Sequence, residues 1–94
     1  MKIAHIIWLD EIIEKLTRKH HVSQDEVKSV LTTSTHFRFV EKGHRPGENV
    51  YFALGQTDAG RYITVFFVQK KNSQALVISA RDMTNVERKK YEKK

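Results

Sequence analysis

The stretch Ala75-Leu-Val-Ile-Ser-Ala-Arg-Asp-Met-Thr-Asn-Val-Glu-Arg-Lys-Lys-Tyr91 decides the fold, because it passes from an apolar strand into a polar helix. Residues 75–80 are all apolar or small apart from one serine, which predicts a buried strand. Thr84 and Glu87 have the spacing of a capping box, so a helix is expected to begin at Thr84. Arg81 is therefore expected where the strand ends and the helix begins.

Arg81 is the leading candidate for an anion-binding residue. Backbone N–H groups at the start of a helix are unpaired and attract anions such as phosphate. The guanidinium of Arg81 adds a planar, bidentate donor beside them, and Arg88 lies one turn into the helix. This pattern indicates a phosphate clamp and favours nucleic acid as the ligand. The alternative is a structural Arg81 that pairs with Asp82 or Glu87 and holds the last helix.

The beginning of the chain predicts a short strand and a helix. Apolar residues within 3–8 indicate the strand. Leu9, Ile12, Ile13 and Leu16 then repeat at the spacing of one helix face, and this helix is expected to end near His20–His21.

A second helix has a strong start signal. Ser23 and Glu26 form a capping box, and Val22 and Val27 are spaced as a hydrophobic staple. The helix is expected to fade over 32–35, a run of polar and β-branched residues.

The remaining residues predict β structure with short connections. The expected strands cover 37–40, 50–54, 61–68 and 75–80, and a polar loop covers Lys42–Asn49. The fold class is therefore α+β in the order β-α-α-β-β-β-β-α. It is an antiparallel sheet with two N-terminal helices on one face and a short C-terminal helix. Alternation places Leu76, Ile78 and Ala80 on one face of the last strand, and Val77, Ser79 and Arg81 on the other.

Length and composition indicate one basic domain over residues 1–94. Its 17 Lys and Arg exceed its 11 Asp and Glu, and the net charge of +6 favours nucleic acid or an acidic protein as partner. The chain has no cysteine, no recognisable signal peptide and no run long enough for a membrane span, so we expect a cytoplasmic protein without membrane contact.

The histidines do not predict a metal site. His20 and His21 are adjacent, so on a helix they diverge by roughly 100°. His5, His36 and His44 lack a spacing typical of metal ligands. No phosphate-binding loop or dinucleotide fingerprint is present either, so we expect neither metal nor cofactor.

Short residue groups spread in order over nearly the whole chain resemble one protein family. These groups are Trp8, Lys19-His20, Val22-Ser23, Gly47-Glu48, Ala53-Leu54-Gly55, Gly60-Arg61, Ile78-Ser79-Ala80-Arg81, Glu87-Arg88 and Tyr91-Glu92. The series is similar to the BrnT toxins of bacterial type II toxin–antitoxin pairs. Two positions depart from the family pattern: Leu9 stands where Asp is usual, and His21 replaces a Gly.

The resemblance implies a RelE-like fold and a small basic ribonuclease that cleaves RNA and inhibits translation. It also implies a cognate antitoxin, a small DNA-binding protein of the ribbon-helix-helix type. DNA would be contacted only indirectly, through the toxin–antitoxin complex. The positions that match the family's cationic and polar site residues are Lys19, His20, Arg61, Arg81, Arg88 and Tyr91.

Metal-free RNA cleavage needs a base, an acid and cations for the phosphate charge, and each site residue also has a structural interpretation. Lys19 stabilises a helix C-terminus, and His20 falls on the apolar stripe as a core histidine. Arg61 opens a strand as an exposed cation. Arg88 can pair with Glu92, and Tyr91 can anchor the last helix. A non-catalytic RNA- or protein-binding module of the same fold is therefore the alternative function.

Overall fold

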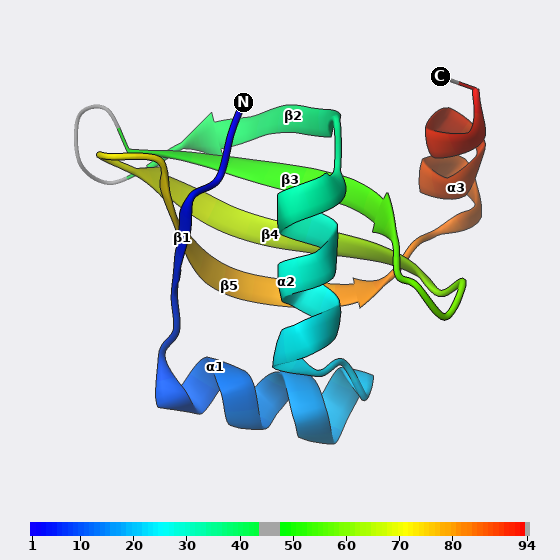
Figure 1. Ribbon diagram of the computed structural model, residues 1–94, viewed down its shortest axis with the longest axis horizontal. Coiled ribbons are helices and arrows are strands. Elements are labelled where there is room, and N and C mark those ends of the chain that lie inside the picture. The colour runs from blue at the N-terminus through cyan, green and yellow to red at the C-terminus, as the bar shows by residue number, and fades with distance from the viewer. Residues whose placement is uncertain (44–47, 94) are drawn as a thin grey trace.

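The chain folds in the order that the sequence predicts. The computed structural model describes residues 1–43 and 48–93, so residues 44–47 of the predicted polar loop lie outside the described residues. The elements are β1 (His5–Ile7), α1 (Asp10–Lys15), the π-helical turn η1 (Leu16–His20), α2 (Gln24–Thr33), β2 (His36–Lys42), β3 (Asn49–Gln56), β4 (Tyr62–Lys70), β5 (Gln74–Asp82) and α3 (Asn85–Glu92). The α+β class and the element order are confirmed (Figure 1).

The sheet is mostly antiparallel. Its strand order is β1-β5-β4-β3-β2, and β2 to β5 form a meander in which each strand pairs antiparallel with the next. The first strand pairs in parallel with β5, the last strand in sequence. This pairing is possible because α1 and α2 carry the chain across one face of the sheet, from the β1 edge to the β2 edge (Figure 1).

The core lies between this face and the two N-terminal helices. The predicted capping box of α2 is present, with bonds of 3.2 Å from the Glu26 N–H to Ser23 Oγ and 3.0 Å from the Ser23 N–H to Glu26 Oε1. Helix α2 lies directly on β3, since a Cβ added to Gly55 would come within 2.9 Å of Val30 Cγ1. The largest fully buried side chains are Phe67, Leu16, Leu31, Leu54, Ile63, Val22, Val27, Val30, Val65, Val77 and Thr64.

The simple alternation predicted for the last strand is wrong. Val77 and Ala80 are both fully buried in the core. In a regular strand, side chains alternate between the two faces, so residues three positions apart would lie on opposite faces. The register shows why: Phe66 pairs with Ser79 and Phe67 with Val77, so Ile78 is an extra residue in a β-bulge. After the bulge Arg81 keeps the face away from α2, directly opposite Thr64.

The first helix also differs from its prediction. It changes from α to π geometry at Leu16. Leu16 is the fully buried member of the apolar stripe, whereas Ile12 and Ile13 are half-buried and Leu9 is an exposed N-cap. His21 then ends the helix in the left-handed conformation, with φ 53° and ψ 40°. His20 consequently lies at the edge of the core, half-buried, and is not one of its buried members. None of the described helices is long and apolar enough to cross a membrane.

Candidate functional site

Arg81 is held in one orientation at the end of β5. Its Nη1 donates to Glu87 Oε1 at 2.7 Å and its Nη2 to Glu87 Oε2 at 2.9 Å. Its guanidinium also lies over the ring of Phe66, with Cζ 5.2 Å from the ring centroid. The hydrogen bond to Glu87 raises the pKa of Arg81 against the opposing effect of burial, so this side chain is a permanent cation.

Glu87 is the residue that the predicted site lacked. Its carboxylate accepts bonds from Arg81, from the Thr84 N–H at 2.9 Å and from Thr64 Oγ1 at 2.9 Å. Burial alone raises the pKa of Glu87, but the bonds from Arg81, Thr84 and Thr64 outweigh it and lower the pKa to about 2. The anion beside Arg81 in this structure is thus an internal carboxylate. The structural alternative, in which Arg81 pairs with Glu87, is therefore present. The phosphate clamp stays a prediction.

Aromatic rings join α3 to the sheet. The Arg88 guanidinium lies 4.1 Å from the centroid of Tyr62, and its Nε is 3.7 Å from the carboxylate of Glu92. Tyr91 meets the rings of Tyr62 and His36 edge-on, each at a centroid distance of 5.9 Å. These contacts agree with the anchoring interpretation of Tyr91, since Tyr91 and Glu87 are the partly buried side chains of an otherwise exposed helix.

Arg61 is a structural clamp on the other face of the same sheet end. Its Nε donates to Asp82 Oδ1 at 2.8 Å, while Nη1 and Nη2 donate to the carbonyls of His21 and His20 at 2.6 and 3.0 Å. Glu26 accepts a further bond at 3.3 Å. The hydrogen bond to Asp82 raises the pKa of Arg61 against burial, helped by the charges of Asp82 and Glu26. The sequence predicts Arg61 as an exposed cation at the edge of a strand. In the structure, each of its three guanidinium nitrogens donates a hydrogen bond.

Lys19 and His20 extend from the turn that Arg61 holds. The Lys19 side chain is exposed and that of His20 is half-exposed. Within residues 1–43 and 48–93, neither side chain forms a hydrogen bond or an ion pair. The interpretation of His20 as a hydrogen-bonded core histidine is therefore wrong, and its ring is available to solvent.

All six predicted residues lie at one end of the sheet. Arg61 bonds to Asp82, the neighbour of Arg81, and Tyr62, the neighbour of Arg61, lies under Arg88. The start of β4 and the end of β5 thus connect two groups of residues. One is Arg61 with the backbone carbonyls of His20 and His21, and the other is the pair of Arg81 with Glu87 of α3. Figure 1 shows this end of β5 between the end of the first helix and α3.

Most of the chain matches one known protein family. Residues 8–87, most of the chain, match the family described as ribonuclease toxin, BrnT, of type II toxin-antitoxin system. The chain belongs to the BrnT family. It is therefore the toxin of a type II system, a class with a cognate antitoxin and an RNA substrate.

The crystal structure of the Brucella abortus BrnT ribonuclease toxin has the same fold. It superposes with a TM-score of 0.61 over 86% of this chain and 97% of that chain, at 19% sequence identity. No curated protein sequence matches the chain. At this identity the likeness establishes the fold, and the assignment of individual site residues rests on the geometry described above.

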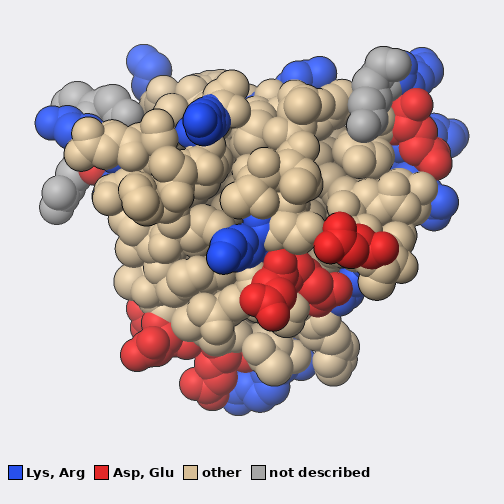
Figure 2. All heavy atoms as spheres, viewed as in Figure 1, with Lys and Arg blue, Asp and Glu red and all other residues tan. Residues whose placement is uncertain are grey.

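Charge is distributed unevenly over this BrnT fold. On the face that α2 covers, most acidic side chains lie over α1 and the start of α2, whereas the margin near β2 and α3 is mainly basic (Figure 2). Since anions are attracted to positive and repelled by negative potential, the margin near β2 and α3 is the more favourable part of this face for a polyanion.

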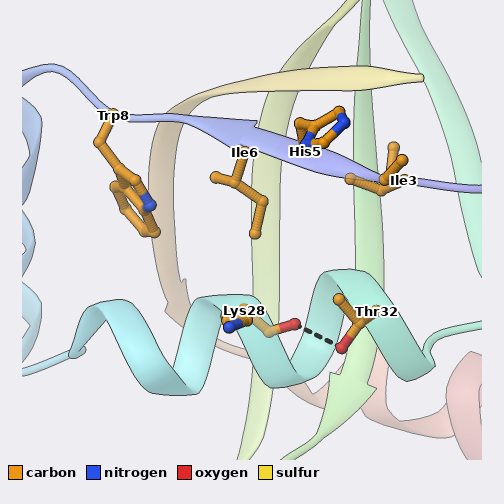
Figure 3. A pocket seen from close by; sticks show the side chains of 7 residues that line it. Ile3, His5, Ile6, Trp8, Lys28 and Thr32 are labelled. Atoms are coloured by element: carbon orange, nitrogen blue, oxygen red, sulfur yellow. Dashed lines mark hydrogen bonds between the residues drawn. The ribbon is translucent and has the colours of Figure 1, made fainter. Parts of the chain in front are cut away.

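A hollow of about 280 Å³ lies apart from the predicted site, between β1 and α2. Ile6 and Trp8 extend toward α2, where the Thr32 hydroxyl donates to the Lys28 carbonyl at 2.8 Å (Figure 3). Trp8 packs against the core, as its apolar surroundings in the sequence suggest. None of the six predicted site residues lines this hollow, so it is not part of the candidate site.

Proposed function

We propose that this chain is a metal-independent endoribonuclease toxin that cleaves cytoplasmic RNA and thereby inhibits translation. The observation that carries the proposal is the fixed guanidinium of Arg81, 2.7 Å from Glu87. It lies at the same sheet end as Lys19 and His20, whose side chains have no hydrogen bond or ion pair among the described residues. A permanent cation in a fixed position stabilises the charge that develops on phosphate during cleavage, without reorganising at the moment of reaction.

The other residues take roles that match their contacts. In cleavage, the ribose 2′-oxygen attacks phosphorus and the bond from phosphorus to the 5′-oxygen breaks; a base takes the 2′ proton and an acid protonates the leaving oxygen. We assign proton transfer to His20, and phosphate neutralisation to Lys19, Arg81 and Arg88. Arg61 acts through the turn it holds and is a positioning residue. Tyr91 fixes α3 by packing against Tyr62, whose ring also contacts the Arg88 guanidinium.

Expression of the chain alone in a bacterial host tests the proposal. Growth and RNA integrity are followed together after induction of the wild type, Arg81→Ala and the matched control Arg18→Ala. Arg18 is an exposed arginine whose ion pair with Glu14 lies on the surface. The wild type and the control should arrest growth and fragment RNA, whereas Arg81→Ala should do neither while it remains folded by circular dichroism.

One observation favours a non-catalytic binding module as the second candidate function. The carboxylate nearest to Arg81 is Glu87, whose pKa of about 2 and three donors leave it unable to act as a general base. A module of this kind would bind RNA or a protein through the same cations without cutting. Abundant folded protein with intact RNA and normal growth would establish it in place of the ribonuclease.

We further propose that the cognate antitoxin is a ribbon-helix-helix DNA-binding protein. The toxin would then contact DNA only through that complex, and the complex would repress the operon of both genes. A neighbouring reading frame with this fold, whose product copurifies with the toxin and shifts operator DNA, is the expected result. An antitoxin of another fold in the same complex would overturn this part of the proposal.

A further inference from the structure

A second hollow lies on the sheet face away from α2, between β2, β3 and α3. Its volume is about 240 Å³. It is lined by His36, Arg38, Phe39, Phe52, Leu54 and Lys90. The alternation of Phe37 and Phe39 with Arg38 is compatible with base stacking, but the sequence favours packing of these rings under the two helices. Phe37 does pack against Phe67, at a centroid distance of 6.0 Å. Phe39 and Phe52 both line the hollow, and Phe52, one strand further in, is half-buried.

Two cations from distant parts of the sequence meet at this hollow. Arg38 and Lys90 are both exposed, and no acidic residue is among the lining residues. In the described part of the chain, Arg38 donates to the Phe37 carbonyl at 3.2 Å, and neither Arg38 nor Lys90 pairs with a carboxylate. Their positive charge is therefore available to an external anion.

A larger hollow at the opposite end of the same face provides the contrast. It has a volume of about 540 Å³ and Lys70 is among its lining residues. There Lys70 Nζ lies 2.9 Å from Glu48 Oε1, and both side chains are about three-quarters buried. Glu41 and Glu48 also line that larger hollow, whereas no acidic residue lines the smaller one, so a polyanion is favoured at the Arg38–Lys90 end.

The aromatic floor of the smaller hollow connects it to Arg81. The rings of Phe52 and Phe66 meet edge-on at a centroid distance of 6.0 Å, and the Arg81 guanidinium lies 5.2 Å from the centroid of Phe66. A nucleotide in the hollow would therefore be linked to the proposed catalytic cation through two aromatic rings, Phe52 and Phe66.

We propose that this hollow binds one base of single-stranded RNA, stacked on Phe52, with the flanking phosphates on Arg38 and Lys90. Exposed aromatic rings beside cations are the usual means of holding unpaired nucleotides, because every base has a stacking face. The inference rests on the proposed function, since it takes RNA as the substrate of the Arg81 site. It adds a subsite that fixes the strand next to that cation.

Binding of a fluorescent RNA oligonucleotide with 2′-O-methyl riboses tests the subsite, because such an RNA lacks the 2′-hydroxyl and cannot be cleaved. Arg38→Ala/Lys90→Ala removes both cations from the hollow. Lys28→Ala/Lys71→Ala is the matched control, since it removes the same charge from exposed lysines that do not line the hollow. We expect the first variant to lose affinity about tenfold or more, with a salt dependence weaker by about two phosphate contacts, and the control to bind nearly as the wild type.

Phe52→Leu tests stacking separately, because it keeps an apolar side chain but removes the ring. We expect about tenfold weaker binding with an unchanged salt dependence. The subsite is overturned if the two double variants lose equal affinity, if Phe52→Leu binds as the wild type, or if duplex RNA binds as well as the single strand. RNA that remains intact in expressing cells, while the oligonucleotide results hold, would instead overturn the ribonuclease proposal and keep the subsite.

Discussion

Arg81 and Glu87 join the last strand to the last helix through two parallel hydrogen bonds of 2.7 and 2.9 Å. Glu87 is also the N3 residue of the α3 capping box, so one carboxylate both starts the helix and orients the arginine. The fixed position of the proposed catalytic cation and the attachment of α3 therefore depend on the same ionised group.

The stability of the fold should depend on the ionisation of Glu87. Because its folded-state pKa of about 2 lies below the ordinary value of 4.5, the stabilisation is present above pH 4.5 and disappears as the pH falls toward 2. We expect the free energy of unfolding to fall by about 2 kcal/mol over this window, with partial exposure of Arg81 reducing the effect. Urea unfolding at several pH values measures it. In Glu87→Gln the same window should show a clearly smaller slope, and an unchanged slope would contradict the assignment.

Replacement of Arg61 should lower the stability of the fold, because Arg61 is a positioning residue and takes no direct part in cleavage. The guanidinium bonds to Asp82 and to the carbonyls of His20 and His21, and Arg61→Ala leaves these acceptors without their donor. We expect a loss of about 2–3 kcal/mol in the free energy of unfolding, measured with urea. Arg18→Ala, with its surface ion pair, should cost less than about 0.5 kcal/mol. A stable Arg61→Ala protein without activity would make Arg61 a direct participant in cleavage.

Replacement of His20 should affect cleavage strongly and stability little, the reverse of the effect expected for Arg61. Its ring forms no hydrogen bond within the described residues, so His20→Ala should change the free energy of unfolding by less than about 0.5 kcal/mol. If His20 transfers a proton, RNA cleavage should slow about 100-fold or more in a gel assay with purified protein. His21→Asn is the neighbouring control, because asparagine tolerates the left-handed backbone there. Full cleavage by His20→Ala would remove His20 from the mechanism.

The helix end at His21 should be improvable. With φ at 53°, a side chain with a Cβ is strained, and glycine adopts this conformation without that cost. We expect His21→Gly to raise the free energy of unfolding by about 0.5–1 kcal/mol and the melting temperature by about 4 °C in calorimetry. The carbonyl that accepts from Arg61 is retained. His21→Ala, which keeps the Cβ, should show no such gain, and equal melting temperatures for the Gly and Ala variants would contradict the strain argument.

Features that depend on neighbouring residues could be predicted from the sequence. Both capping boxes are present at the predicted residues, because Ser23 with Glu26 and Thr84 with Glu87 interact within one helical turn. The order of the elements followed from apolar periodicity in the same way. The sequence allows two interpretations of Arg81, a phosphate clamp and an ion pair with Glu87. Which of them holds depends on how close the start of the helix comes to the end of the strand.

Features that depend on distant residues could not be predicted. The four acceptors of Arg61 come from His20, His21, Glu26 and Asp82, which no spacing connects. The bulge at Ile78 arises from the pairing of β5 with β4, and a pattern of alternating residues carries no sign of it. The hollow beside Phe52 needs α3 to return over the sheet, which the sequence of α3 alone does not indicate.

The parallel pairing of β1 with β5 has a consequence for the timing of toxin synthesis. The first strand to leave the ribosome finds its neighbour only when Gln74 to Leu76 have been made, near the end of the chain. Because the contact is so distant in sequence, the sheet closes late. Arg81 and Glu87 follow that strand, so the cationic end assembles only after nearly the whole chain has been translated. A nascent or truncated toxin that lacks these last residues would thus lack its proposed cutting site.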